Sequence, residues 1–132
     1  MSVKDKLIEL LKELHLFHSD ASIALGDFNL NSKDDLKEGI YKNQEDQWYV
    51  AHREGCLSCK GSYYYSYGKS WDFLDTIFVS RDRGIYFDKD SINVLKTDFN
   101  TYKDSGKPHR FDPKTKKGVS DHFPMVSRIN LN

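Results

Sequence analysis

The sequence has no long apolar run, no excess of charge of one sign and only two cysteines. A membrane-spanning helix needs ~20 consecutive apolar residues, and no segment of the chain approaches that length. Twenty basic residues balance twenty acidic ones, which excludes a strongly basic nucleic-acid binder of the histone type. Two cysteines are too few for a disulfide-built scaffold or for a zinc site with four cysteine ligands.

What is present suffices for one folded domain. Hydrophobic residues make up 38% of the chain and aromatic residues 14%, so a packed core is expected rather than disorder. A length of 132 residues allows one domain and leaves no room for two. Residues 1–132 are therefore predicted to form a single domain, with no internal repeat, linker or signal peptide.

The two cysteines form a C-x-x-C pair. Cys56 and Cys59 follow His52, which lies four residues upstream of Cys56. Three interpretations stay open: a zinc site completed by a distant fourth ligand, a local disulfide, or two reduced thiols. Zinc is the least favoured of these, because four-ligand sites normally show a second pair of ligands.

Apolar spacing predicts two helices and several strands. Residues 3–15 follow helical spacing after Ser2, a candidate N-cap, and are predicted to form an amphipathic helix. The run Ala21–Leu25 is typical of a short buried strand. A second helix is predicted over 32–39, with Ser32 as its cap and the glycine at 39 as its stop. Further strands are predicted over residues 63–67, 71–80, 91–97 and 124–129.

Two of these segments have wider implications. The strand predicted over Trp71–Ser80 is apolar on both faces, which indicates burial on both sides. The other predicted elements can cover one face of a sheet, so the second face is expected to need a partner. Residues 98–118 are polar, with glycines and prolines, and are predicted to form a loop. A loop of this length is unusual in a compact domain unless it is functional or disordered.

The first short segment whose side chains could take part in catalysis is Gly26-Asp27-Phe28-Asn29. The Asp27 carboxylate can accept a proton or hold a hydrolytic water, and the Asn29 amide can donate to an oxyanion. Strand alternation predicts these two side chains on one side. Gly26 is expected to let another group approach the backbone. An Asx turn is the alternative interpretation.

Two further strings supply an acid and a histidine. Asp75 lies inside the strand predicted to be buried, where an unpaired carboxylate would cost several kcal/mol. It should therefore pair with a basic side chain or orient a histidine. Within Gly118–Pro124, His122 can act on a phosphoryl oxygen or a leaving group, and Asp121 can hold a magnesium ion. The alternative is a turn with a chance Asp-His pair.

The three segments GDFN, SWDFLDTIFVS and SDHFP follow one another in this order along the chain. That order resembles the endonuclease/exonuclease/phosphatase superfamily, which has the fold of the pancreatic-type deoxyribonucleases. The resemblance covers essentially the whole chain and matches the C-terminal half of such an enzyme. It implies an α+β fold: half of a four-layer αββα sandwich, with a mostly antiparallel sheet and a helix packed on one face. It also implies metal-dependent hydrolysis of phosphate esters.

The resemblance assigns a role to each polar residue. Asp27 would orient or deprotonate the attacking water, Asn29 would support the phosphoryl group, and Asp75 would pair with His122. Asp121 would contribute to a Mg²⁺ or Mn²⁺ site. The metal-binding residues of the family's first half have no counterpart, so the catalytic site is expected to be incomplete in this chain. The implied partners are a complementing N-terminal half or a second copy.

The basic loop indicates the substrate. Residues 103–117 combine basic side chains with interleaved aromatics, which suits a nucleic-acid backbone and also a phosphorylated headgroup. Nucleic acid is favoured, and the side chains expected to bind it are Arg110, Lys114, Lys116 and Lys117. Two other hypotheses stay open: a catalytically silent fragment or binding module, and a small nucleic-acid binder outside the superfamily. The last predicts that Asp27, Asp75 and His122 are scattered in space.

Overall fold

A three-stranded antiparallel sheet forms the centre of the computed structural model, which describes residues 2–132. Its strand order is β1 (Ile23–Asp27), β5 (Asp75–Ser80) and β2 (Trp48–Val50). Three two-stranded antiparallel sheets, β3–β4, β6–β9 and β7–β8, complete the strand pairing. The predicted α+β class with antiparallel strands is confirmed.

The remaining elements follow in chain order. They are α1 (Val3–Phe17), α2 (Ser32–Glu38), α3 (Ile40–Gln44), α4 (Ala51–Glu54), β3 (Tyr63–Tyr65), β4 (Ser70–Asp72), β6 (Ile85–Phe87), a 3₁₀ turn (Lys89–Ser91), β7 (Asn93–Val94), β8 (Met125–Val126) and β9 (Ile129–Leu131).

Helix α1 forms as predicted and ends two residues later than expected. Its first turn is closed by a capping box, in which the Ser2 hydroxyl accepts the Asp5 N–H and the Asp5 carboxylate accepts the Ser2 N–H. For α2, Asn31 and not Ser32 is the N-cap, because the Asn31 side-chain oxygen accepts the Asp34 N–H at 2.8 Å. Gly39 ends α2 in the left-handed conformation, as predicted.

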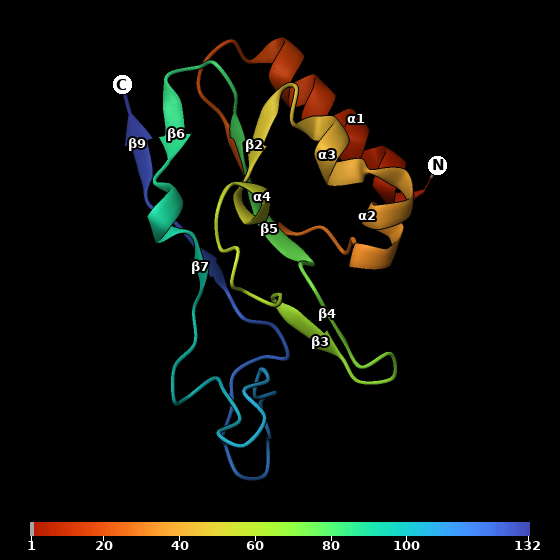
Figure 1. Cartoon of the computed structure of the whole chain (residues 1–132), viewed down its shortest axis with the longest axis vertical. Coiled ribbons are helices and arrows are strands. Elements are labelled where there is room, and N and C mark those ends of the chain that lie inside the picture. Colours follow the sequence, from red (N-terminus) through yellow and green to blue (C-terminus); the bar gives the residue numbers. More distant parts are fainter. Residues whose placement is uncertain (1) are drawn as a thin grey trace.

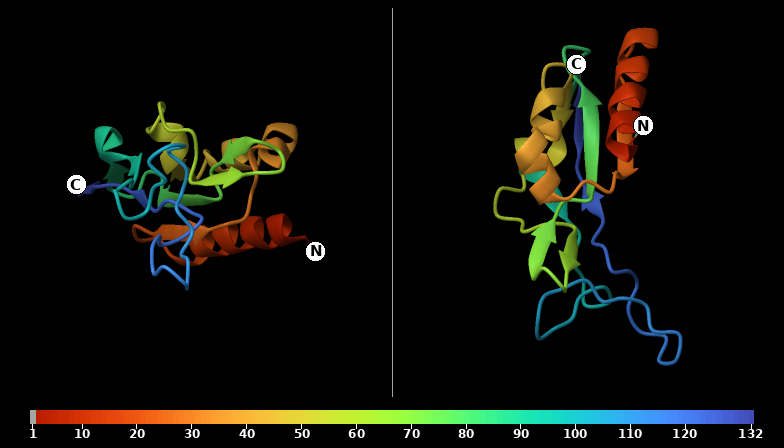
Figure 2. Two further views of the ribbon diagram at one scale, coloured as in Figure 1. Left: turned by 90° about the horizontal axis from the view of Figure 1, so that it is seen from below. Right: turned by 90° about the vertical axis from the view of Figure 1, so that its right-hand side faces the viewer.

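Helices α1 to α3 and the β6–β9 pair lie on opposite sides of the central sheet. Figure 1 shows α1, α2 and α3 on one side of β5, with β6 and β9 on the other. In the right-hand view of Figure 2, α1 and the α2–α3 pair flank β5. The core on the helix side contains Leu7, Leu11, Leu30, Ile40, Tyr41, Trp48, Val50 and Phe78.

The strand predicted over Trp71–Ser80 is in fact two strands. β4 pairs with β3 in a hairpin, whereas β5 pairs with β1 and β2, so the chain leaves one sheet and enters another between them. The Leu74 carbonyl at this break accepts the Phe28 N–H at 2.8 Å. Asp75 is therefore the first residue of β5 and not an interior residue of one long strand.

Three other predicted strands are shorter than expected. The segment 63–67 gives only β3, and the segment 91–97 gives only the two residues of β7. The segment 124–129 is divided between β8, which pairs with β7, and β9, which pairs with β6. Each strand is limited by the short partner it finds, which sequence periodicity does not reveal.

The second face of β5 does not need a partner, contrary to expectation. Ile77 and Val79 point to that face and are 8% and 0% exposed. They pack with Ala51 and with three residues of the segment 85–92, Ile85, Phe87 and Ile92. The chain therefore covers both faces of β5. The sequence analysis did not anticipate this, because it did not predict the short strands 85–87 and 129–131.

Strand β1 is different, because it has an open edge and an exposed face. Within residues 2–132 the structure pairs β1 with β5 alone. Ile23 and Leu25 lie opposite Val79 and Ile77 in register, so they share the face just described. Leu25 is nevertheless 68% exposed. β1 therefore has both an unpaired backbone edge and an exposed apolar side chain.

The long polar segment forms a loop, as predicted. Among the described residues, 98–118 contain no helix or strand, and Figure 1 shows this loop extending away from the central sheet, beyond β7. None of the helices within residues 2–132 has the length and apolar character needed to cross a membrane.

The cysteines form a local disulfide, which decides between the three interpretations left open. Cys56 and Cys59 are bonded to each other, so neither is a zinc ligand nor a free thiol. The bond closes a four-residue loop between α4 and β3.

Replacing both cysteines by alanine is expected to lower the free energy of unfolding by about 2 kcal/mol, because the short loop gains chain entropy in the unfolded state. The measurement is urea unfolding of the oxidised protein and of the Cys56→Ala/Cys59→Ala variant. Reducing the parent protein should lower its stability by a similar amount and leave the double variant unchanged. A larger loss on reduction of the double variant would contradict this account.

Candidate active site

The site begins where β1 ends and β5 starts. Asp27 lies directly opposite Asp75 in the β1–β5 register, so both carboxylates project from the same face at the same end of the sheet. Gly26 has φ +145°, which a residue with a side chain rarely adopts, and no described atom lies within 4 Å of its Cβ position. Gly26 therefore suits this backbone conformation, and no described protein atom approaches it; the expected approach of another group stays a prediction.

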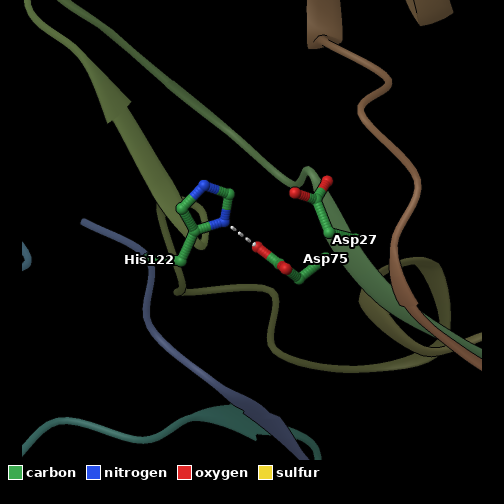
Figure 3. Close-up of side chains that lie close together, drawn as sticks. All are labelled: Asp27, Asp75 and His122. Carbon is green, nitrogen blue, oxygen red and sulfur yellow. Dashed lines mark hydrogen bonds and ion pairs between the residues drawn. The ribbon is translucent and has the colours of Figure 1, made fainter. Parts of the chain in front are cut away.

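The predicted pairing of Asp75 with His122 is confirmed as a geometry. The Nδ1 atom of His122 lies 2.6 Å from Oδ2 of Asp75, and both side chains are largely buried (Figure 3). With Nδ1–H donating to the carboxylate, Nε2 is left to accept or deliver a proton. The partner of Asp75 is thus a histidine and not an arginine or lysine.

A second carboxylate completes a compact group. Figure 3 shows the carboxylate of Asp27 close to that of Asp75, from the adjacent strand. Donor atoms of Asp27, Asp75 and His122 all lie within 4.8 Å of one another. These residues span 96 positions of the chain, so their convergence is a property of the fold. A scattered arrangement, expected for an unrelated small binder, is not what the chain has.

Asn29 combines both interpretations made for it. Its backbone is left-handed, with φ +53°, and its N–H donates to Oδ1 of Asp27 at 2.9 Å, which is an Asx turn. Strand alternation therefore ends before Asn29. Asn29 and Asp27 still line the same cavity of about 990 Å³, together with His122.

Asp121 lies on the other side of the imidazole from Asp75. Its Oδ1 is 3.9 Å from Nε2 of His122, and its Oδ2 is 3.5 Å from the Arg110 guanidinium. Asp121 lines the cavity but is not part of the compact group. Of the four expected substrate-binding side chains, only Arg110 contacts a site residue among those described. The lysines at 114, 116 and 117 are exposed and are not among the described cavity residues.

Ser62 holds the Asp75–His122 pair in place, and the sequence gives no signal for this role. It is fully buried. Its hydroxyl accepts the Asp75 N–H at 3.1 Å, and its carbonyl accepts the Phe123 N–H at 2.7 Å. One residue therefore fixes the backbone on both sides of the dyad. Its partners lie 13 and 61 positions away along the chain, beyond the range of any local motif.

The turn that carries His122 depends on Gly118. A Cβ at this position would lie 2.2 Å from the Arg110 carbonyl oxygen, and its φ is +80°. Only glycine allows this close approach, which is continued by the Val119 N–H bond to the carbonyl of His109. Four residues later the His122 N–H donates to the Ser120 hydroxyl at 3.1 Å.

The sequence analysis missed further cavity residues, among them two tyrosines, an asparagine and a lysine. Tyr63 and Tyr65 come from β3, Asn31 caps α2, and Lys33 lies in the first turn of that helix. The tyrosines were interpreted as strand formers only. Their strand alternation, with Tyr64 turned the other way, was the available signal that two of them share one face.

His52 has a structural environment and not a metal site. Its ring stacks on Phe73 at 4.7 Å between centroids and meets the edge of Tyr41 at 4.5 Å. Its Nδ1 is 2.8 Å from the Thr76 hydroxyl. Burial, with a smaller effect of the Arg53 charge, lowers the pKa of His52 to about 4.

Stability is expected to fall as the pH drops from 6.5 to 4, because the unfolded chain binds a proton at His52 in this window while the folded chain does not. The shift corresponds to a loss of about 3 kcal/mol once the pH is below both pKa values. Urea unfolding across this pH range is the measurement. His52→Gln, which cannot titrate, should show a shallower pH dependence; parallel curves for the two proteins would contradict the prediction.

The donor set of the cavity fits a magnesium ion. Mg²⁺ is held by one or two carboxylates, together with waters and substrate phosphate oxygens. The carboxylate residues Asp27, Asp72 and Asp121 line the cavity. Asp75 is less suited, because one of its oxygens is already bonded to His122. Asp27, which belongs to the compact group, and Asp121, the ligand that the resemblance implies, are therefore lining carboxylates that could each offer an oxygen to such an ion.

Comparisons of the chain with protein families, with curated proteins and with solved structures gave no match. The functional assignment therefore depends on the three sequence strings and on the geometry that brings them together.

Proposed function

We propose that this cavity is the active site of a metal-dependent phosphoesterase acting on phosphodiesters of nucleic acid. The observation that carries the proposal is the 2.6 Å contact between Asp75 and Nδ1 of His122, beside the Asp27 carboxylate. The resemblance of GDFN, DTIFVS and SDHFP to the endonuclease/exonuclease/phosphatase superfamily supports it.

Each residue has a defined part in such a hydrolysis. Asp75 fixes the tautomer of His122, so that Nε2 faces the phosphoryl group or the leaving oxygen. Asp27 accepts the proton of the attacking water while the new bond from water oxygen to phosphorus forms. The bond to the leaving oxygen breaks, and that oxygen receives the Nε2 proton of His122, which enters this step protonated on both nitrogens, with its positive charge stabilised by the Asp75 carboxylate. Asn29 donates its amide hydrogen to a phosphoryl oxygen. A bound Mg²⁺ or Mn²⁺ would neutralise charge on the phosphoryl oxygens.

We further propose that a second polypeptide or a second copy of the chain completes the metal site. Two carboxylates make a weak magnesium site without additional ligands. The open edge of β1 provides a place for a partner, because it exposes Leu25 two residues before Asp27. A strand added there would bring new side chains next to Asp27.

Leu25→Lys is expected to abolish association at the β1 edge, because a charged side chain on an edge strand opposes pairing with another strand. Light scattering should give a mass above 15.4 kDa for the parent chain and 15.4 kDa for the variant. Leu57→Lys, an exposed leucine outside β1, is the matched control. A parent chain that is monomeric at all concentrations would contradict self-association and leave a different polypeptide as the partner.

The proposed activity is tested with bis(p-nitrophenyl) phosphate at high protein concentration and saturating magnesium. A slow hydrolysis is expected that disappears with chelator and with His122→Ala. A parallel arm follows the imidazole signals of His122 by NMR while a phosphodiester product and magnesium are added. No hydrolysis together with no perturbation of His122 would favour the silent-fragment hypothesis.

A further inference from the structure

The β3–β4 hairpin presents a row of tyrosine rings to the cavity. Tyr63 and Tyr65 occupy alternate positions of β3, so their side chains share one face about 7 Å apart. Both line the cavity that contains His122. The ring of Tyr63 lies 4.9 Å from the imidazole of His122, between centroids. Tyr63 is thus the inner ring and Tyr65 the outer one.

The ring of Tyr65 packs against the hairpin turn at Gly68. A Cβ on Gly68 would lie 2.7 Å from a ring carbon of Tyr65, so the missing side chain lets the ring rest on the hairpin turn. Tyr65 is still 45% exposed, and Tyr67 is the neighbouring ring, at 5.9 Å. A supported ring that remains open to solvent can receive a planar group without rearranging.

The opposite face of the hairpin is already occupied. Tyr64 meets the edge of Trp71 at 5.4 Å and carries the Lys107 ammonium 3.9 Å above its ring. Tyr67 in the hairpin turn is even more exposed, at 92%, so Tyr65 is distinguished by its place in the cavity and not by exposure alone.

The charges of the cavity restrict the ligand further. Among its described residues, Lys33 is the one lysine or arginine, whereas Asp27, Asp72 and Asp121 are acidic. A multiply phosphorylated headgroup requires several cationic donors, which this wall does not supply. The lining instead suits a ligand with one phosphodiester in the cavity and a planar group beside it.

One side chain of the basic loop reaches a residue that lines the cavity. Arg110, which is mostly exposed, contacts Asp121 at 3.5 Å and begins a basic stretch that continues to Lys117. A chain of phosphodiesters that leaves the cavity can meet these side chains, whereas a single phosphodiester headgroup ends before reaching them. This favours a nucleic acid over a choline phosphodiester, although tyrosine rings can also bind quaternary ammonium groups.

We propose that the substrate is an unpaired nucleic-acid strand, whose base stacks on Tyr65 while the adjoining phosphodiester lies at His122 and Asp27. The strand must be unpaired because the base faces of a duplex are covered by neighbouring bases. This inference rests on the proposed function for the role of His122, but the stacking site itself does not depend on catalysis.

The test compares the affinities of three fluorescent probes for the full chain by anisotropy, with magnesium present and phosphorothioate linkages to slow hydrolysis. The probes are a short oligothymidylate, an abasic strand of the same length, and a duplex containing the same thymidylate strand. Tyr65→Ala should weaken oligothymidylate binding by about 5- to 140-fold, which corresponds to the ~1–3 kcal/mol measured for base–aromatic stacking. Its effect on the abasic strand should be negligible.

Two further variants make the test specific. Tyr65→Phe keeps the ring and should restore the affinity. Phe99→Ala removes an aromatic ring that is 78% exposed and is not among the described cavity residues, and it should leave all affinities unchanged.

Several outcomes would overturn the inference. Equal affinity for the abasic and the normal strand, tighter binding of the duplex, or no effect of Tyr65→Ala would each do so. Tyr65-dependent competition by glycerophosphocholine would assign the rings to a choline headgroup instead. If hydrolysis requires His122 but binding ignores Tyr65, the proposed function stands and the substrate assignment fails. If binding requires Tyr65 but hydrolysis ignores His122, the stacking site stands and the phosphoesterase proposal fails.

Discussion

His122→Ala is expected to lower the magnesium-dependent rate of phosphodiester hydrolysis by about 10²- to 10⁴-fold, the range that a positioned general acid or base contributes. The imidazole is held by Asp75 at Nδ1, and its Nε2 lies on the cavity side towards Asp121. Removing it deprives the leaving oxygen of its proton donor. The measurement is the initial rate of diester hydrolysis at saturating magnesium, corrected for the rate with magnesium alone.

Asp75→Asn tests whether His122 must be held by a carboxylate or need only be present. The amide has the size of the carboxylate but carries no charge, so it no longer stabilises the doubly protonated imidazole that donates its Nε2 proton. A loss of activity comparable to that of His122→Ala is therefore expected, without further loss in the double variant. His18→Ala, an exposed histidine at the end of α1, is the matched control. Rates that fall equally in all three single variants would indicate damage to the fold and contradict the assignment.

Features encoded by neighbouring residues were predictable from the sequence. The spacing of leucines between Ser2 and the end of α1 gave that helix, since burial of one face requires side chains three or four positions apart. Gly39 was recognisable as a helix stop because its left-handed conformation is a local property. The dyad of Asp75 and His122 was predicted by the resemblance of two short strings, and not by any rule of spacing.

Features that depend on distant partners were not predictable. The break after Asp72 arises because β4 finds β3, and β5 finds β1 and β2. Periodicity alone cannot show a change of sheet within one apolar run. Ser62 has the same origin, since a buried serine acquires its role from the two backbones that reach it. The tyrosines of β3 were identified as strand formers. Only the structure shows that Tyr63 and Tyr65 also line the cavity.

A substitution of Phe78 tests whether the chain folds without a partner. Its side chain is 0% exposed and lies at the centre of an aromatic cluster on the helix side of the sheet. Ring centroids of Phe28, Tyr41 and Trp48 are 5.1, 6.0 and 6.3 Å from its own. The cluster joins β5 to the segment after β1, to α3 and to β2, so it fixes the strand that carries Asp75.

Phe78→Ala is expected to lower the free energy of unfolding by about 3–5 kcal/mol, because it loses a buried ring and leaves a cavity. A domain of this kind has a total of about 5–15 kcal/mol, so the variant should unfold at a much lower urea concentration, as followed by tryptophan fluorescence. Phe99→Ala, whose ring is exposed, should change the value by less than about 0.5 kcal/mol. Since Ile77 and Val79 are covered on the other face by the segment 85–92, both cores are made by this chain. A loss below about 1 kcal/mol for Phe78→Ala would mean that the helix-side core forms only when a partner is bound.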